Sequence, residues 1–119
     1  MAALVTPSIA PADSLAALRQ EFGLSREKFA RLLGVSAKTV ERWEGRVARP
    51  SGDLAGQRLA QLLELADLGH RVLDTAGFAR FLDTPQPSLR YRTPLALIER
   101  GEAEAVIGVL ASLDAGTGY

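Results

Sequence analysis

The 119-residue sequence contains no cysteine and only one histidine, His70. Without cysteine, the chain cannot form disulfide bonds, thiolate metal sites or a cysteine nucleophile. A single histidine excludes a metal site built from several imidazoles and argues against histidine-based catalytic arrangements. Long apolar runs are also missing, since no uncharged stretch approaches the roughly 20 residues that span a bilayer. We therefore expect no metal, no other cofactor and no transmembrane segment.

The first residues do not have the composition of a signal peptide. The stretch MAALVTPSIAPAD lacks a basic region, and Pro7 and Pro11 interrupt its apolar residues. Hydrophobic residues make up 47% of the chain and charged residues 24%, which is typical of a globular protein. We expect a cytoplasmic protein with one medium domain or two very small ones.

The net charge of zero conceals an asymmetry between the two halves. Residues 1–60 carry nine Lys or Arg and six acids, whereas residues 61–119 carry five Arg and eight acids. The first half can approach a polyanion, and the second half is repelled by one. Chance is the alternative explanation for a difference of this size.

Capping residues and glycines predict three short helices, at 15–22, 26–33 and 37–44. The capping candidates are Asp13 or Ser14, then Ser25 and Ser36, and the terminating residues are Gly23, Gly34 and Gly45. A fourth, long helix is predicted to begin near Pro50–Ser51, and Gly69 is expected to break or bend it. No segment shows the period-two alternation of a strand.

The carboxy-terminal half also reads as helical. Phe78, Phe81 and Leu82 form a short apolar face, and the three prolines of TPQPSLRYRTP predict an ordered, turn-rich connection. Thr93 is expected to cap a helix over 94–100 with proline at its first position. One stripe of a final helix contains Ala103, Val106, Ile107, Leu110 and Leu113.

The segment REKFARLLGVSAKTVERWEG, residues 26–45, is typical of a helix-turn-helix. Ala30 lets the two helices cross closely, Gly34 suits a turn with positive φ, and Val40 faces inward. The remaining apolar side chains expected to be buried here are Phe29, Leu32, Leu33, Val35 and Trp43. A plain helical hairpin with surface arginines is the alternative interpretation.

The second helix of such a motif can enter the major groove of DNA. Lys38 and Arg42 lie one turn apart on its exposed face, and both can donate to guanine O6 and N7. Ala37 suits a thymine methyl group, whereas Glu41 is expected to face away from the duplex and Glu44 to pair with a nearby arginine. The candidates for contacts with phosphates are Arg26, Ser36, Thr39, Arg46 and Arg49.

The longer segment LSREKFARLLGVSAKTVERWEGRVARPS resembles the Xre (phage-repressor-like) helix-turn-helix family, and the match extends over roughly 15–65. The resemblance implies that Arg26 occupies the position of a phosphate-clamping glutamine and that positions 36, 37, 38 and 42 read DNA. Because one module contacts too few bases for tight binding, we expect a homodimer on a palindrome-like site of double-stranded DNA.

The segment FLDTPQPSLRYRTPLALIERGEAEAVIGVLASLDAG resembles the toxin-binding domain of the Xre/MbcA/ParS antitoxins. The shared features are a bulky residue near Phe81, where many relatives have Trp, the proline-bearing loop to Leu89, the Thr-Pro-Leu-x-x-Ile-x-x-Gly turn at 93–101 and the closing helix. The resemblance implies a RES-domain toxin, which consumes NAD, as the partner whose active-site mouth is covered. The candidate toxin contacts are Arg90, Arg92, Leu113 and Tyr119.

The predicted organisation is all-α, with a helix-turn-helix bundle followed by a small helical domain. It comprises a tail at 1–12, a DNA-binding domain at 13–68 and a toxin-binding domain at 69–119. The function that the resemblance implies is an antitoxin that represses its own promoter and is not an enzyme. The alternative is a stand-alone Xre-type regulator whose second half dimerises or senses a signal. Arg90 and Arg92 also fit a small anion site or a solvated loop, and Tyr119 a disordered tail.

Overall fold

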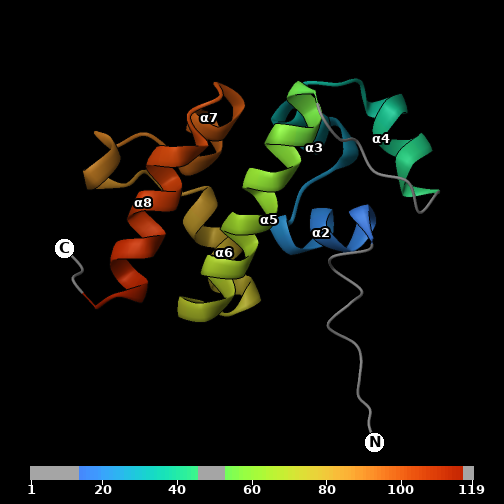
Figure 1. Ribbon diagram of the computed structural model, residues 1–119. Helices are drawn as coiled ribbons and strands as arrows, with labels where there is room; N and C mark the ends of the chain where they lie inside the picture. Colours follow the sequence, from blue (N-terminus) through green and yellow to red (C-terminus); the bar gives the residue numbers. More distant parts are fainter. Residues whose placement is uncertain (1–13, 46–52, 117–119) are drawn as a thin grey trace, which may run out of the picture.

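The computed structural model describes residues 14–45 and 53–116, and within these ranges the chain is helical without a β-strand (Figure 1). The all-α prediction is confirmed. The helices are α2 (Leu15–Phe22), α3 (Arg26–Leu33), α4 (Ala37–Glu44), α5 (Leu54–Val72), α6 (Thr75–Leu82), the 3-10 helix η1 (Pro87–Leu89), α7 (Pro94–Glu99) and α8 (Ala103–Asp114). Within the described part of the chain, no helix is long and apolar enough to cross a membrane.

Side-chain caps fix where the amino-terminal helices begin. Ser14, Ser25 and Ser36 each accept a hydrogen bond from the backbone N–H three residues ahead, at 3.1–3.2 Å. Gly23 and Gly34 end α2 and α3 in the left-handed region, with φ of 70° and 77°. These are the caps and terminators that the sequence predicts, so the three short helices have their predicted bounds.

Helix α5 begins later than the sequence predicts. Its first residue is Leu54, because the carboxylate of Asp53 caps the helix by accepting from the N–H of Gly56 at 2.9 Å. The expected start near Pro50–Ser51 lies outside the described residues. Because Asp is as strong a cap as Ser, the position of the helix start was ambiguous in the sequence.

Gly69 does not break α5, which continues to Val72. The residue is buried against the ring of Phe78 from α6, and a Cβ at Gly69 would lie 2.5 Å from two ring carbons. Glycine is present here because the aromatic ring packs directly on the helix backbone, which no other residue would allow.

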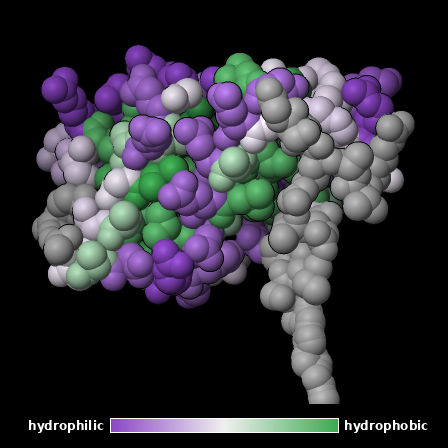
Figure 2. Space-filling view, in the orientation of Figure 1, coloured by the Kyte–Doolittle hydropathy of each residue, from purple (hydrophilic) through white to green (hydrophobic). Residues whose placement is uncertain are grey.

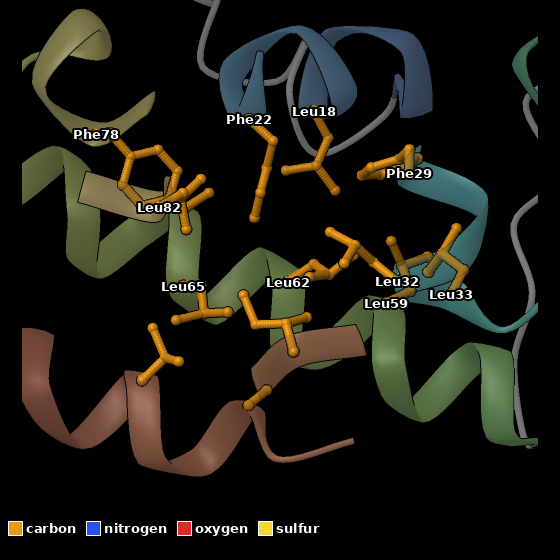
Figure 3. Close-up of a cluster of buried hydrophobic side chains, with 14 of the residues drawn as sticks. Leu18, Phe22, Phe29, Leu32, Leu33, Leu59, Leu62, Leu65, Phe78 and Leu82 are labelled. Atoms are coloured by element: carbon orange, nitrogen blue, oxygen red, sulfur yellow. The ribbon is translucent and has the colours of Figure 1, made fainter. Parts of the chain in front are cut away.

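A single hydrophobic core surrounds α5, which contacts α2, α3, α6 and α8 (Figures 1 and 3). Phe22 packs edge-on against both Phe29 and Phe78, with ring centroids 6.2 and 5.3 Å away. Leu62 and Leu65 of α5 are fully buried in the same cluster. Helix α5 and this core extend across residue 68, so the two parts expected at 13–68 and 69–119 share one central helix.

Polar contacts join the two parts as well. The guanidinium group of Arg58, on α5, lies between the turn at Gly34 and the turn at Gly101, and its Nη1 donates to the carbonyl of Leu32 at 3.4 Å. Arg31 of α3 lies 3.9 Å from the carboxylate of Glu99 of α7. The turn of the helix-turn-helix is therefore in contact with the carboxy-terminal helices.

The carboxy-terminal helices follow the predicted pattern except at the end of α8. Thr93 caps α7 by accepting from the N–H of Ala96 at 3.1 Å, and the core-facing side chains of α8 are Ala103, Val106, Val109 and Leu110. Ile107 is only partly buried, and Leu113 is 37% exposed, so neither is a full member of the expected apolar stripe. Leu113 lies in the last turn of α8, where no residue from 111 to 114 is buried.

Candidate nucleic-acid interface

The turn between α3 and α4 has the geometry that the sequence predicts. Gly34 has positive φ, and its N–H donates to the carbonyl groups of Ala30 and Arg31. Ala30 is 2% exposed and Val40 is fully buried, so the two helices cross closely and α4 is anchored on α3. Val35 and Trp43 are partly buried at the edge of the same contact.

Helix α4 lies at one end of the molecule, at the right in Figure 1, where it packs on α3 and α2. Lys38 and Arg42 are exposed, Ala37 and Thr39 are partly exposed, and Ser36 is exposed. Figure 2 shows strongly hydrophilic atoms over this end of the molecule. The outward-facing helix that DNA reading requires is therefore present, with two cations on its surface.

The sequence predicts that Glu41 faces away from the duplex, whereas the structure places this side chain next to Lys38 and Arg42. Glu41 is exposed and lines the same surface hollow as Lys38 and Arg42. On a helix, residues three and four positions apart share a face, which places Glu41 beside Lys38 rather than opposite it. The exposed face of α4 thus combines two hydrogen-bond donors with one carboxylate acceptor.

Glu44 connects the end of α4 to two other helices through arginine side chains. Its Oε2 accepts from Nε of Arg19 at 2.7 Å, and its Oε1 accepts from Nε of Arg26 at 2.9 Å. Arg19 also donates to the carbonyl of Leu24 at 3.0 Å. The predicted pairing of Glu44 with a nearby arginine is confirmed, and Arg19 is a partner that the sequence analysis did not identify.

The hydrogen-bonded ion pairs of Glu44 shift the pKa of its carboxyl group and the pKa of Arg26. Burial of Glu44, whose side chain is 5% exposed, raises the pKa of its carboxyl group. The hydrogen bonds and positive charges of Arg19 and Arg26 outweigh burial, so that pKa lies below its ordinary value of 4.5. The hydrogen bond to Glu44, followed by the charge of Glu44, raises the pKa of Arg26. Glu44 therefore stays ionised and holds α4 in place.

Three side chains that are predicted to contact phosphates, Arg26, Ser36 and Thr39, also form hydrogen bonds within the protein. Arg26 is bound to Glu44, although 45% of its side chain is exposed. The hydroxyl group of Ser36 caps α4 and forms a hydrogen bond with the hydroxyl group of Thr39 at 2.9 Å. Arg46 and Arg49 lie outside the described residues. Contacts of all five side chains with phosphates stay predictions.

The candidate toxin contacts lie in the carboxy-terminal half, away from α4. Arg90 and Arg92 are exposed in the loop after η1, where they flank Tyr91. Leu113 is on the last turn of α8, and Tyr119 lies outside the described residues. Tyr91 is not among the residues that the sequence predicts as contacts, and 72% of its surface is exposed.

The crossing of α3 and α4 and the exposed face of α4 have the geometry of a helix-turn-helix. The helix-turn-helix family model matches residues 15–66. Antitoxin HigA-2 of Vibrio cholerae serotype O1 is 42% identical to this chain over 40 residues, which cover 34% of this chain and 38% of that protein. The chain thus matches well under half the length of this curated relative.

A solved structure resembles nearly the whole chain. It is a chain in the crystal structure of the MbcT–MbcA toxin–antitoxin complex of M. tuberculosis, with a TM-score of 0.74 and 24% sequence identity. The superposition covers 92% of this chain and 98% of that chain, so the fold is shared across both halves. The family model thus assigns residues 15–66 to a helix-turn-helix, and the solved structure shows that the fold of both halves has a known counterpart.

Proposed function

We propose that this chain is the antitoxin of a toxin–antitoxin system, which binds DNA through α4 and a toxin through its carboxy-terminal half. The observation that supports this most is the extent of the shared fold. A helix-turn-helix alone would account for residues 15–66, whereas the fold of the chain from the toxin–antitoxin complex extends over 92% of this one. The short match to an antitoxin of Vibrio cholerae points in the same direction.

In this proposal α4 enters the major groove of the promoter of its own gene. Arg42 and Lys38 donate to guanine, Ala37 contacts a thymine methyl group, and Glu41, on the same face, accepts from the N4 amino group of cytosine. The phosphate contacts come from the side chains named above, including Arg46 and Arg49. Two copies of the chain bind a two-fold symmetric site, because a single α4 reads few base pairs.

The proposed partner is a RES-domain toxin that consumes NAD, as the resemblance of residues 81–116 to the Xre/MbcA/ParS antitoxins implies. The antitoxin covers the mouth of the toxin's active site, with Arg90, Arg92, Leu113 and Tyr119 among its contacts. The chain then acts by binding alone in the cytoplasm, without a catalytic residue or a cofactor of its own.

The test is to express the chain together with the protein encoded by the adjacent gene, which this proposal expects to be a RES-domain toxin, and to measure growth and cellular NAD. We expect the chain to restore both, and we expect the purified chain to bind its promoter in fluorescence anisotropy. If the chain binds its promoter but restores neither growth nor cellular NAD, the stand-alone regulator is the better interpretation. Point variants are preferable to truncation at residue 68, because that cut would divide α5 and expose Leu62 and Leu65 of the core.

A further inference from the structure

The loop at residues 86–92, called here the 86–92 loop, is closed by its own backbone. The N–H of Tyr91 donates to the carbonyl of Gln86 at 2.8 Å, and the N–H of Gln86 donates to the carbonyl of Arg92 at 3.1 Å. Within the loop, η1 contributes Leu89, which is 6% exposed and belongs to the core, and η1 contacts α8. The loop is therefore a fixed part of the fold.

Two adjacent residues of this loop have an unfavourable backbone conformation. Arg90 and Tyr91 have φ of 59° and 63°, and they are the non-glycine residues with positive φ in the described part of the chain. Such conformations persist where the surrounding structure imposes them, and they concentrate at functional sites. Here they turn the Tyr91 ring outward, so that this aromatic side chain is 72% exposed.

The charged residues next to Tyr91 in the sequence are positive. Arg90 and Arg92 precede and follow it, and no acidic residue occurs between Asp83 and Glu99 in the sequence. Neither arginine forms an ion pair with any other described residue, and Nε of Arg92 donates to the carbonyl of Leu89 at 3.3 Å. Two exposed arginines and an exposed tyrosine thus follow one another along this loop in the acidic half of the chain.

The 86–92 loop and α4 lie at opposite ends of the molecule (Figure 1). A duplex that α4 reads would therefore not reach this loop. Of the two macromolecules that the proposed function requires, the protein partner is the one that fits here.

We infer that Tyr91 is the anchor by which this chain grips its toxin, inserting into a pocket of the toxin whose rim is acidic; this rests on the proposed function. Tyrosine and arginine dominate the energetic centres of protein interfaces, because the ring buries a large area and the guanidinium groups pair with carboxylates. A rigid loop loses little conformational entropy on binding, which explains why the strained backbone is maintained.

The experiment measures the affinity of the full-length chain for the purified RES-domain toxin by biolayer interferometry. Tyr91→Ala is expected to weaken binding by at least about thirtyfold, mainly through faster dissociation, and Tyr91→Phe by less than about threefold. Arg90→Glu is expected to weaken binding about tenfold and to flatten its salt dependence, since it replaces a cation at an acidic rim. Leu54→Ala is the matched control, because Leu54 is also an exposed apolar side chain, at 58%, but belongs to α5.

The possible failures are distinguishable. If the wild-type chain does not bind the toxin, the proposed function is wrong. If the wild-type chain binds and folded Tyr91→Ala binds equally well, or no worse than Leu54→Ala, the inference about Tyr91 is wrong and the proposed function stands. Loss of promoter affinity in Arg90→Glu, or loss of a dimer of this chain in Tyr91→Ala, with toxin binding unchanged, would overturn the inference in favour of DNA or a second copy.

Discussion

Helix α4 and the 86–92 loop both project from the core around α5, but they use the left-handed backbone region differently. The turn that positions α4 has glycine at its left-handed position, Gly34, where the backbone alone matters. The 86–92 loop has Arg90 and Tyr91 at its left-handed positions, although glycine would be less strained there. We infer from this difference that the 86–92 loop needs the side chains of Arg90 and Tyr91 for binding. The turn at Gly34 needs only a backbone conformation that glycine adopts easily.

A destabilising substitution in the core between α4 and the 86–92 loop should weaken both DNA binding and toxin binding. We expect Gly69→Ala to lower the free energy of unfolding by about 2–3 kcal/mol, because the added Cβ overlaps the ring of Phe78. Promoter binding and toxin binding should then fail together on warming. Urea denaturation followed by circular dichroism measures the effect.

Gly108→Ala is the matched control for that prediction. Gly108 is also within a helix, α8, but a Cβ there would meet no atom within 4 Å. Alanine should therefore raise the free energy of unfolding by about 0.5–1 kcal/mol through its better helix propensity. Equal effects of the two substitutions would show that the close contact with Phe78 is absent.

The amino-terminal part could be predicted from the sequence almost residue by residue. A serine cap and a terminating glycine bound α2 and α3, and such local signals do not depend on the rest of the fold. The role of Gly69 was not predictable, since it depends on Phe78 packing from another helix. The ion pair of Arg19 with Glu44 joins positions 25 residues apart, a separation at which the sequence carries no pairing signal.

The 86–92 loop shows the limit of sequence reasoning most clearly. Its prolines predict a turn, and the turn is present. The positive φ of Arg90 and Tyr91 has no signal in the sequence, because Asn, Asp and Gly are the residues that usually mark this conformation. It arises from the pairing of Gln86 with Arg92, which closes the loop and sets the direction of Tyr91.

A substitution in α4 should affect DNA binding alone and leave toxin binding by the 86–92 loop unchanged. Arg42→Ala should weaken binding to the promoter by about 1–3 kcal/mol and relax the preference at one base pair, because it removes a bidentate contact with guanine. Its toxin affinity and its unfolding free energy should match those of the wild-type chain, since Arg42 is exposed. Fluorescence anisotropy with single-base variants of the site measures this, and full retention of affinity would contradict the docking of α4.

The third prediction concerns the ion pairs that hold α4. Glu44→Gln should lower the free energy of unfolding by about 1–2 kcal/mol at neutral pH, because it removes the negative charge and leaves one acceptor oxygen for the two arginine donors. The pKa of Glu44 is lower in the folded chain than its ordinary value of 4.5, so its stabilisation is complete above that pH and is lost as the pH falls towards the folded value. Stability of the wild-type chain should therefore fall more steeply than that of Glu44→Gln below pH 4.5, as urea titrations at each pH would measure. Parallel curves would contradict this account of Glu44.

Two further substitutions test the different use of the left-handed backbone region at Gly34 and at Arg90. Gly34→Ala should destabilise the fold by about 1–2 kcal/mol, because alanine is strained at positive φ. Arg90→Gly should raise the free energy of unfolding by about 0.5 kcal/mol, since relief of strain slightly exceeds the added flexibility of the unfolded chain. Toxin affinity of Arg90→Gly should nevertheless fall. If Arg90→Gly is neither more stable nor weaker in toxin binding, the loop is not a strained contact surface.

The most direct test of the account as a whole is whether one molecule binds toxin and DNA at once. Mass photometry of the full-length chain with its promoter fragment and the RES-domain toxin would give the composition of each complex. Because α4 and the 86–92 loop lie at opposite ends of the molecule, we predict a ternary complex, in which Arg42→Ala lowers the DNA-bound fraction and Tyr91→Ala lowers the toxin-bound fraction. Displacement of the toxin by DNA, with no ternary species at any concentration, would contradict the assignment of the two ligands to two separate surfaces.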